Sequence, residues 1–197
     1  CKTIFMFIRI APFGGGILLV ALLSNCSNTN QQPDLQATSE RITNTDPSFT
    51  NIYDKALNWA ENGDERVLPL CDSLLKNGDA QTGASPYYYL GIYYAEKGDT
   101  ARSIGFFDKT IITDYNFLEA YIEKAALLLA QKKSAAARKE LELLRAVAPS
   151  YAPCHYWIAK VAAFEQKNDL ALLHYKLALS LDSTLQEARE AILELEK

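Results

Sequence analysis

The sequence of 197 residues has few of the side chains that usually build a reactive or metal-binding site. It contains two histidines, four cysteines and one methionine, which leaves little material for a metal centre. Its 20 basic side chains are outnumbered by 24 acidic ones, for a formal net charge of −4. Because nucleic-acid binding needs a clustered positive excess, we expect no nucleic-acid partner. Apolar residues make up 49% of the chain and charged residues 22%, which excludes a mainly disordered protein.

Catalytic motifs are also missing from the sequence. It has no Gly-x-Ser-x-Gly motif and no Cys–His pairing. The run Gly14–Gly16 follows no predicted strand and precedes no lysine, so it is not a phosphate-binding loop. His155 and His174 have no Cys or His at ligand spacing, and we expect both to be structural. Cys71 and Cys154 are expected to be buried and apolar, with a disulfide as the alternative. We therefore expect no enzyme, no cofactor and no metal.

Residues 1–25 differ from the rest of the chain in composition. They contain two bases, no acid and an apolar run, Ile10–Leu23, that is too short to span a bilayer comfortably. The run ends in Leu23-Ser24-Asn25-Cys26, which resembles the bacterial lipobox. That resemblance implies a lipoprotein signal peptide over 1–25, with cleavage before Cys26 and lipidation of that cysteine. The alternatives are ordinary secretion and an uncleaved anchor. Met6 is the expected start of translation.

The segment after Cys26 is polar. Residues 27–48 are rich in Ser, Thr, Asn, Gln and Asp, with few apolar side chains to bury. We therefore predict a lipidated flexible tether over 26–48.

A pattern of small and large apolar residues recurs about every 34 residues from residue 49 onward. Its clearest copy reads Tyr87-x2-Leu90-Gly91-x2-Tyr94, followed by Ser103-x3-Phe107. This pattern resembles the tetratricopeptide repeat (TPR), in which each unit is a helical hairpin. The resemblance implies an all-α fold, a right-handed superhelical stack of hairpins (an α-solenoid) that forms one TPR domain over 49–197.

The register of the pattern predicts four repeats and a closing helix. The repeats are placed at 49–83, 84–117, 118–151 and 152–185, and a capping helix follows at 184–197. Small residues at matching positions are expected to let helices approach closely, and these are Ala56, Gly91, Ala125 and Ala159 in the first helices and Ser103, Ala137 and Ala171 in the second.

Three residues of the repeats depart from the family pattern. Leu68 replaces the small residue in the second helix of the first repeat. Pro69 is expected to remove a backbone hydrogen bond early in the second helix of the first repeat. Lys124 stands where the family has leucine.

The resemblance also implies a concave groove lined by fixed positions of each first helix. The residues on these positions are mainly apolar and aromatic, unlike the basic set with which some TPR proteins clamp a carboxylate. We therefore expect apolar anchors to bind a partner helix or extended peptide, or else to pack on the tether or cap. The predicted groove residues are Tyr53, Leu57, Tyr88, Ile92, Ile122, Leu129, Tyr156, Lys160 and Phe164; three acids, Glu61, Glu96 and Glu119, share the lining positions.

Together these features favour a membrane-anchored protein–protein interaction scaffold of the bacterial envelope. Its partner is expected to be a protein or peptide, and its location the periplasmic side of the outer membrane. One alternative is a glycan- or nutrient-binding repeat lipoprotein, which would need a deep aromatic pocket. Another is an enzyme with a cryptic site, which would need converging titratable groups.

Overall fold

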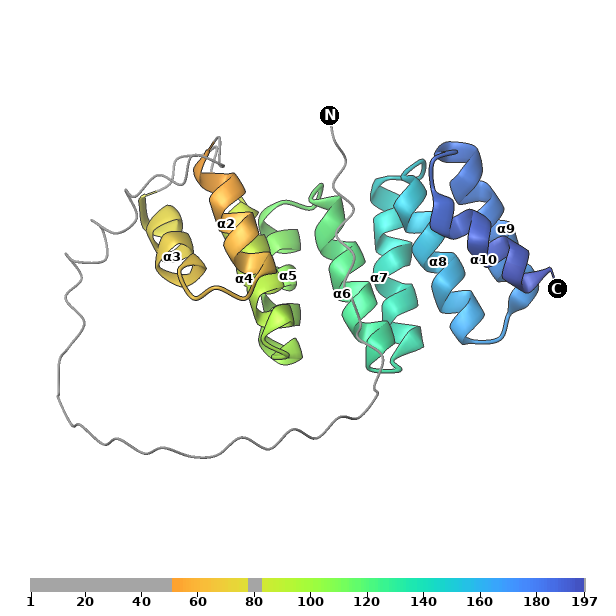
Figure 1. Ribbon diagram of the computed structural model, residues 1–197, viewed down its shortest axis with the longest axis horizontal. Coiled ribbons are helices and arrows are strands. Elements are labelled where there is room, and N and C mark those ends of the chain that lie inside the picture. Colours follow the sequence, from red (N-terminus) through yellow and green to blue (C-terminus); the bar gives the residue numbers. More distant parts are fainter. Residues whose placement is uncertain (1–50, 78–82, 197) are drawn as a thin grey trace, which may run out of the picture. The chain divides into compact units, whose positions relative to one another are not determined.

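The computed structural model describes residues 51–77 and 83–196, and within these ranges it contains nine α-helices and no strand (Figure 1). The predicted signal peptide, Cys26 and the predicted tether lie outside the described residues. In chain order the helices are α2 (Ile52–Glu61), α3 (Val67–Asn77), α4 (Ser85–Glu96), α5 (Thr100–Thr113), α6 (Leu118–Ala130), α7 (Ser134–Val147), α8 (Ala152–Phe164), α9 (Asn168–Leu181) and α10 (Gln186–Leu195).

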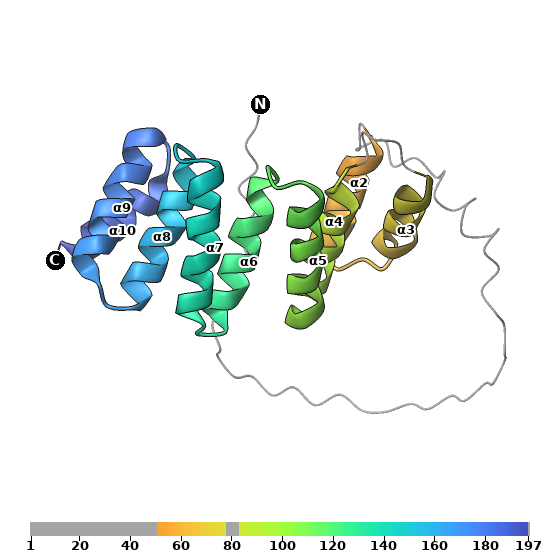
Figure 2. The same ribbon diagram turned by 180° about the vertical axis from the view of Figure 1, so that it is seen from behind.

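Neighbouring helices in the chain pack on each other as hairpins. The pairs α4–α5, α6–α7 and α8–α9 have the most extensive contacts, and α2 packs on both α3 and α4. Successive hairpins are joined through α5 against α6 and α7 against α8, as Figure 2 shows from behind. Finally, α10 packs on α9. This arrangement confirms the predicted all-α helical-repeat fold.

Small residues mark the places where the helices of a hairpin come closest. All seven of the predicted small positions are buried. In the second hairpin, the Ser103 hydroxyl of α5 donates a hydrogen bond of 2.7 Å to the Gly91 carbonyl oxygen of α4. A side chain at Gly91 would enter the ring of Phe107, so only glycine allows this approach.

Large apolar side chains fill the space between the hairpins. One buried cluster joins α6, α7 and α8 through residues such as Tyr121, Leu141 and Ile158. A second cluster joins α8, α9 and α10, with Tyr175 near its middle. The apolar face of α10 and the residue before it close this second cluster, because Leu185 and Ala188 are buried there and Ile192 and Leu195 pack against it.

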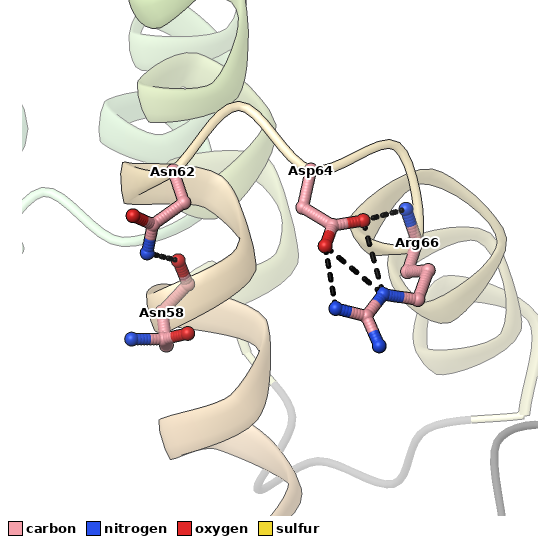
Figure 3. A network of polar contacts seen from close by, with 4 residues as sticks. All are labelled: Asn58, Asn62, Asp64 and Arg66. Carbon is pink, nitrogen blue, oxygen red and sulfur yellow. Dashed lines mark hydrogen bonds and ion pairs between the residues drawn. The ribbon is translucent and has the colours of Figure 1, made fainter.

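Polar side chains hold the turn between α2 and α3 (Figure 3). The Asp64 carboxylate accepts hydrogen bonds from the Arg66 backbone N–H at 3.0 Å and from its guanidinium Nη2 at 2.6 Å. The same guanidinium lies over the Trp59 ring, 4.7 Å from its centroid. The Asn62 side chain donates to the Asn58 carbonyl at the end of α2. These contacts link the end of α2 to the beginning of α3.

Two of the departures from the family pattern have clear structural outcomes. Pro69 is the third residue of α3, in the first helical turn, where a proline is tolerated because most N–H groups there have no partner inside the helix. The N–H groups of Val67 and Leu68, just before it, bond to the Asp64 and Glu65 carbonyls. The Lys124 ammonium pairs with Asp108 of α5 at 2.6 Å and with Glu140 of α7 at 2.9 Å. Lys124 therefore links α6 to α5 and α7 through ion pairs, where a leucine would make apolar contacts instead.

The two cysteines of the described residues are buried, as expected. Cys71 and Cys154 are buried free thiols, which excludes the alternative of a disulfide between them. His155 is buried; its Nε2 lies 2.9 Å from the Pro149 carbonyl oxygen, and its ring stacks on that of His174. No group of three or more His, Cys, Asp or Glu side chains in residues 51–77 and 83–196 is placed to hold a metal ion.

Candidate functional site

The predicted groove residues differ widely in exposure. Tyr88 and Ile92 are only 8% and 1% exposed. The Tyr88 ring packs against Phe107 and Phe117, with centroid distances of 5.8 and 4.7 Å. Phe107 belongs to α5 of the same hairpin, and Phe117 directly precedes α6. Tyr88 and Ile92 are therefore core residues and cannot act as exposed anchors.

The other seven predicted residues are half-buried or exposed. Ile122 and Leu129 pack partly against the core of α6, α7 and α8, and Tyr156 packs partly against the core of α8, α9 and α10. Tyr53, Leu57 and Lys160 are half-buried, whereas Phe164 is 48% exposed. That these positions bind a peptide stays a prediction.

Lys160 is held by aromatic rings at the C-terminal end of the predicted groove. Its ammonium lies 4.3 Å from the centroid of Trp157 and 5.4 Å from that of Tyr156, so both rings can attract its charge. Burial lowers the pKa of Lys160, and the nearby Glu187 carboxylate acts in the opposite direction.

Four carboxylates from three hairpins interact near the other end of the predicted groove. We call them the acidic cluster: Glu61 of α2, Glu96 of α4, and Glu119 and Glu123 of α6. Glu123 is 7% exposed, which is unusual for a charged side chain. Burial, followed by repulsion from the other three carboxylates, raises the pKa of Glu123 to about 8. Burial also raises the pKa of Glu96, and burial followed by repulsion from Glu96 raises that of Glu61.

Two tyrosine hydroxyl groups lie beside the acidic cluster. Burial, followed by the nearby Glu119 carboxylate, raises the pKa of Tyr151, just before α8, well above its usual value. Burial, with smaller contributions from Glu123, Glu119 and Glu61, raises the pKa of Tyr88 well above its usual value. Both hydroxyls therefore stay protonated in the neutral pH range and can donate hydrogen bonds.

Sequence reasoning missed Glu123 as a site residue. The groove positions carried over from the TPR pattern include Glu119 but not Glu123. The spacing of the two residues nevertheless indicated Glu123, because it follows Glu119 by four positions and residues four apart lie on the same side of a helix. The buried environment of Glu123 depends on neighbouring hairpins and has no comparable signal in the local sequence.

Comparisons with known proteins give a consistent account of the fold. No protein-family model matches the sequence. The chain is 31% identical over 93 residues to anaphase-promoting complex subunit 3 of Schizosaccharomyces pombe. The match covers 47% of this chain and 14% of that protein, so the chain spans only a small part of its relative.

Two solved structures are similar over larger parts of the described residues. The first TPR domain of RPAP3 (Spaghetti), bound to the HSP90 peptide SRMEEVD, has a TM-score of 0.55 and 21% identity, and the match covers 57% of this chain and 92% of that one. MamA from Desulfovibrio magneticus RS-1 has a TM-score of 0.57 and 23% identity, over 73% of this chain and 81% of that one. With the helical hairpins described above, these similarities show that the chain has the fold of tetratricopeptide-repeat proteins.

Proposed function

We propose that this chain is a protein–protein interaction module that binds a protein or peptide partner along its first helices. The RPAP3 domain, a neighbour in fold, is bound to a peptide in its solved structure, which supports this role. The observation that carries the proposal is the presence of half-buried and exposed side chains at the groove positions of α2, α6 and α8. Such faces of a helical repeat suit recognition of a helix or an extended peptide.

A crosslinking experiment tests this role in living cells of the source organism. A photoreactive phenylalanine analogue replaces Phe164 on α8, and in a matched variant it replaces Leu143 on α7. Both native side chains are 48% exposed, but Phe164 lies on a first helix and Leu143 on a second. A defined crosslinked partner from position 164 and none from position 143 is the expected result. Equal crosslinking at both positions, or none at either, would contradict the proposal.

The interaction module is, in our proposal, attached to the bacterial envelope by a lipid on Cys26, at the periplasmic side of the outer membrane. The lipobox-like sequence that ends at Cys26 supports this anchor. Among the helices of the described residues, none combines the length and apolar character needed to cross a bilayer.

Metabolic labelling with an alkyne fatty acid tests the anchor. The wild-type protein should be labelled and should sediment with outer membranes, whereas Cys26→Ser should lose the label. A Cys26→Ser protein that is still labelled and still sediments with membranes would show that the attachment lies elsewhere. Cys71→Ser is a matched control, because this buried thiol is a free cysteine of α3.

A further inference from the structure

We propose that the hydrogen-bonded pair His155–His174 is a pH-sensitive link between α8 and α9, which holds the surface of α8 in place at neutral pH and loosens it in mildly acidic solution. His155 lies on α8 and His174 on α9, so the pair joins the two helices of one hairpin. The link is a property of the fold and does not depend on the proposed interaction function.

The first observation is a chain of two hydrogen bonds that runs through both rings. His155 Nε2 lies 2.9 Å from the Pro149 carbonyl oxygen, and His155 Nδ1 lies 3.2 Å from His174 Nδ1. A carbonyl oxygen only accepts, so His155 Nε2 carries a proton and, in the neutral ring, His155 Nδ1 carries none. His174 Nδ1 must therefore donate to His155 Nδ1. At neutral pH this network allows a single arrangement of protons.

Acid disturbs this chain in two steps. The first proton binds at His174 Nε2, a ring nitrogen that forms no hydrogen bond within the described residues, and it places a positive charge between the two helices. A second proton, at His155 Nδ1, would set two N–H donors against each other across 3.2 Å. The hydrogen bond between the rings would then be lost. Each step therefore weakens the contact of α8 with α9.

The surroundings of the pair do not stabilise the added charge. His155 is buried and His174 is half-buried. The other charged group that acts on His174 is the Arg145 guanidinium of α7, which is positive as well. Within residues 83–196, no carboxylate of α7, α8, α9 or α10 forms an ion pair with either ring. Burial, followed by the nearby His155 and Arg145, lowers the pKa of His174.

The direction of the pH effect follows from the lowered pKa of His174. In the unfolded chain this ring takes up its proton near pH 6.5, whereas in the folded chain it does so only at lower pH. The folded hairpin therefore keeps the full contribution of the pair above about pH 6.5. It loses that contribution progressively as the pH falls from 6.5 to the lower pKa of the folded state.

The pair lies beside predicted groove residues of α8. Tyr156 directly follows His155, Tyr175 directly follows His174, and the two tyrosine rings pack on each other with centroids 5.7 Å apart. The Trp157 ring lies 6.2 Å from that of Tyr156. Because Tyr156 is supported by α9 through Tyr175, loosening of α8 from α9 changes the surface that α8 presents. Protonation of a histidine pair thereby acts on a surface one residue away.

An NMR titration of the full chain from pH 8 to pH 5 tests the hydrogen-bonded chain. The protein has only these two histidines, so every imidazole signal belongs to the pair. At pH 8 we expect protons on His174 Nδ1 and His155 Nε2, and a scalar coupling between the two Nδ1 nuclei across their hydrogen bond. Below pH 6.5 we expect His174 to take up its proton. Protons on Nε2 of both rings at pH 8, or uptake of a proton by His174 above pH 6.5, would overturn the proposal.

Amide hydrogen exchange with a matched variant tests the loosening of the hairpin. His174→Asn keeps a short N–H donor near the position of Nδ1 but cannot take up a proton. After correction for the pH dependence of chemical exchange, opening of α8 and α9 should increase several-fold between pH 6.5 and 5.5 in the wild type, with about tenfold as the limit for one proton. It should not increase in His174→Asn. An equal increase in the two proteins would overturn the proposal, because groups outside the pair titrate in both.

The two tryptophans give an internal control that needs no variant. Trp157 lies on α8 and Trp59 on α2, and each has one indole N–H signal. We expect the Trp157 signal to follow the titration of His174 and the Trp59 signal to stay in place. Equal shifts of both signals would show a change throughout the fold, and no shift of Trp157 would show that the surface of α8 is unaffected; either result would overturn the link.

Discussion

Replacement of Gly91 by alanine is the sharpest test of how the hairpins pack. Gly91 lies on α4 against the fully buried Phe107 of α5. A Cβ atom on Gly91 would lie 2.5 Å from Cε1, 2.7 Å from Cδ1 and 3.0 Å from Cζ of that ring. Distances below 3.0 Å require a shift of the ring or of a helix, and the hydrogen bond from Ser103 to the Gly91 carbonyl opposes separation of the two helices.

Two opposing effects determine how much Gly91→Ala changes the free energy of unfolding. Alanine favours a helix interior over glycine by about 1 kcal/mol, which would stabilise the variant. Overpacking of a filled core typically costs about 1–3 kcal/mol and sometimes more. The ring of Phe107 has no exposed side toward which it could move, so we expect overpacking to dominate. Gly91→Ala should therefore lower the free energy of unfolding by up to about 2 kcal/mol, and Gly91→Leu by more.

Gly105 supplies a matched control on the adjacent helix. It lies within α5 and is exposed, and a Cβ atom there would meet nothing within 4 Å. Gly105→Ala should therefore raise the free energy of unfolding by about 0.5–1 kcal/mol through helix propensity alone.

Urea unfolding followed by circular dichroism measures both variants. A Gly91→Ala protein as stable as Gly105→Ala would refute the close contact and the repeat register built on it. The double variant Gly91→Ala with Phe107→Leu adds a further check, because a smaller side chain should accept the new methyl group. Its loss of unfolding free energy should be smaller than the sum of the losses in the two single variants, because the effects of substitutions at contacting residues are not additive.

Three further predictions concern charge and thiol chemistry. Burial and neighbouring carboxylates raise the pKa of Glu123 to about 8, from 4.5 in an unfolded chain. This shift lowers stability as the pH rises from about 4.5 to about 8, and its effect is constant above that. Glu123→Gln should therefore flatten the decline in urea stability between about pH 5 and 8, and an unchanged slope would contradict this. Lys124→Met leaves two carboxylates unpaired and should lower the free energy of unfolding in urea by about 1–3 kcal/mol. Lys139→Met, on the exposed surface of α7, should lower it little, and equal losses in the two variants would count against the ion pairs. Burial raises the thiol pKa of Cys71 to about 12 and that of Cys154 to about 11. Iodoacetamide at pH 8 should therefore modify both thiols slowly until urea unfolds the protein, as measured by mass spectrometry. Rapid labelling of the native protein would contradict their burial.

The helical-repeat fold could be predicted because its requirements recur locally in the chain. A small residue must occupy one position of each first helix, and Ala56, Gly91, Ala125 and Ala159 occupy it at intervals of 34 or 35 residues. All four are buried in the structure. The repeat period and the side-chain volumes can both be read from the sequence, and they determine which helices form and which helix faces pack together.

The exposure of the groove residues could not be predicted in the same way. Tyr88 and Ile92 occupy lining positions in the TPR pattern, yet they are buried, while Phe164 at an equivalent kind of position is exposed. Side chains of adjacent elements decide this outcome: Phe107, on α5 of the same hairpin, and Phe117, just before α6, pack against the Tyr88 ring. A position in a repeat specifies a direction from the helix axis, but not how far an adjacent side chain extends over it.

Glu123 shows the same division between sequence and tertiary structure most clearly. Its sequence context is that of an ordinary surface glutamate, one helical turn after Glu119. Only the stacking of hairpins removes it from water and places carboxylates of α2 and α4 near it. The sequence alone determined the repeating helices, because their spacing and side-chain volumes are local. Tertiary structure decided where like charges meet out of water, because burial and electrostatic interaction depend on distances between residues far apart in the chain.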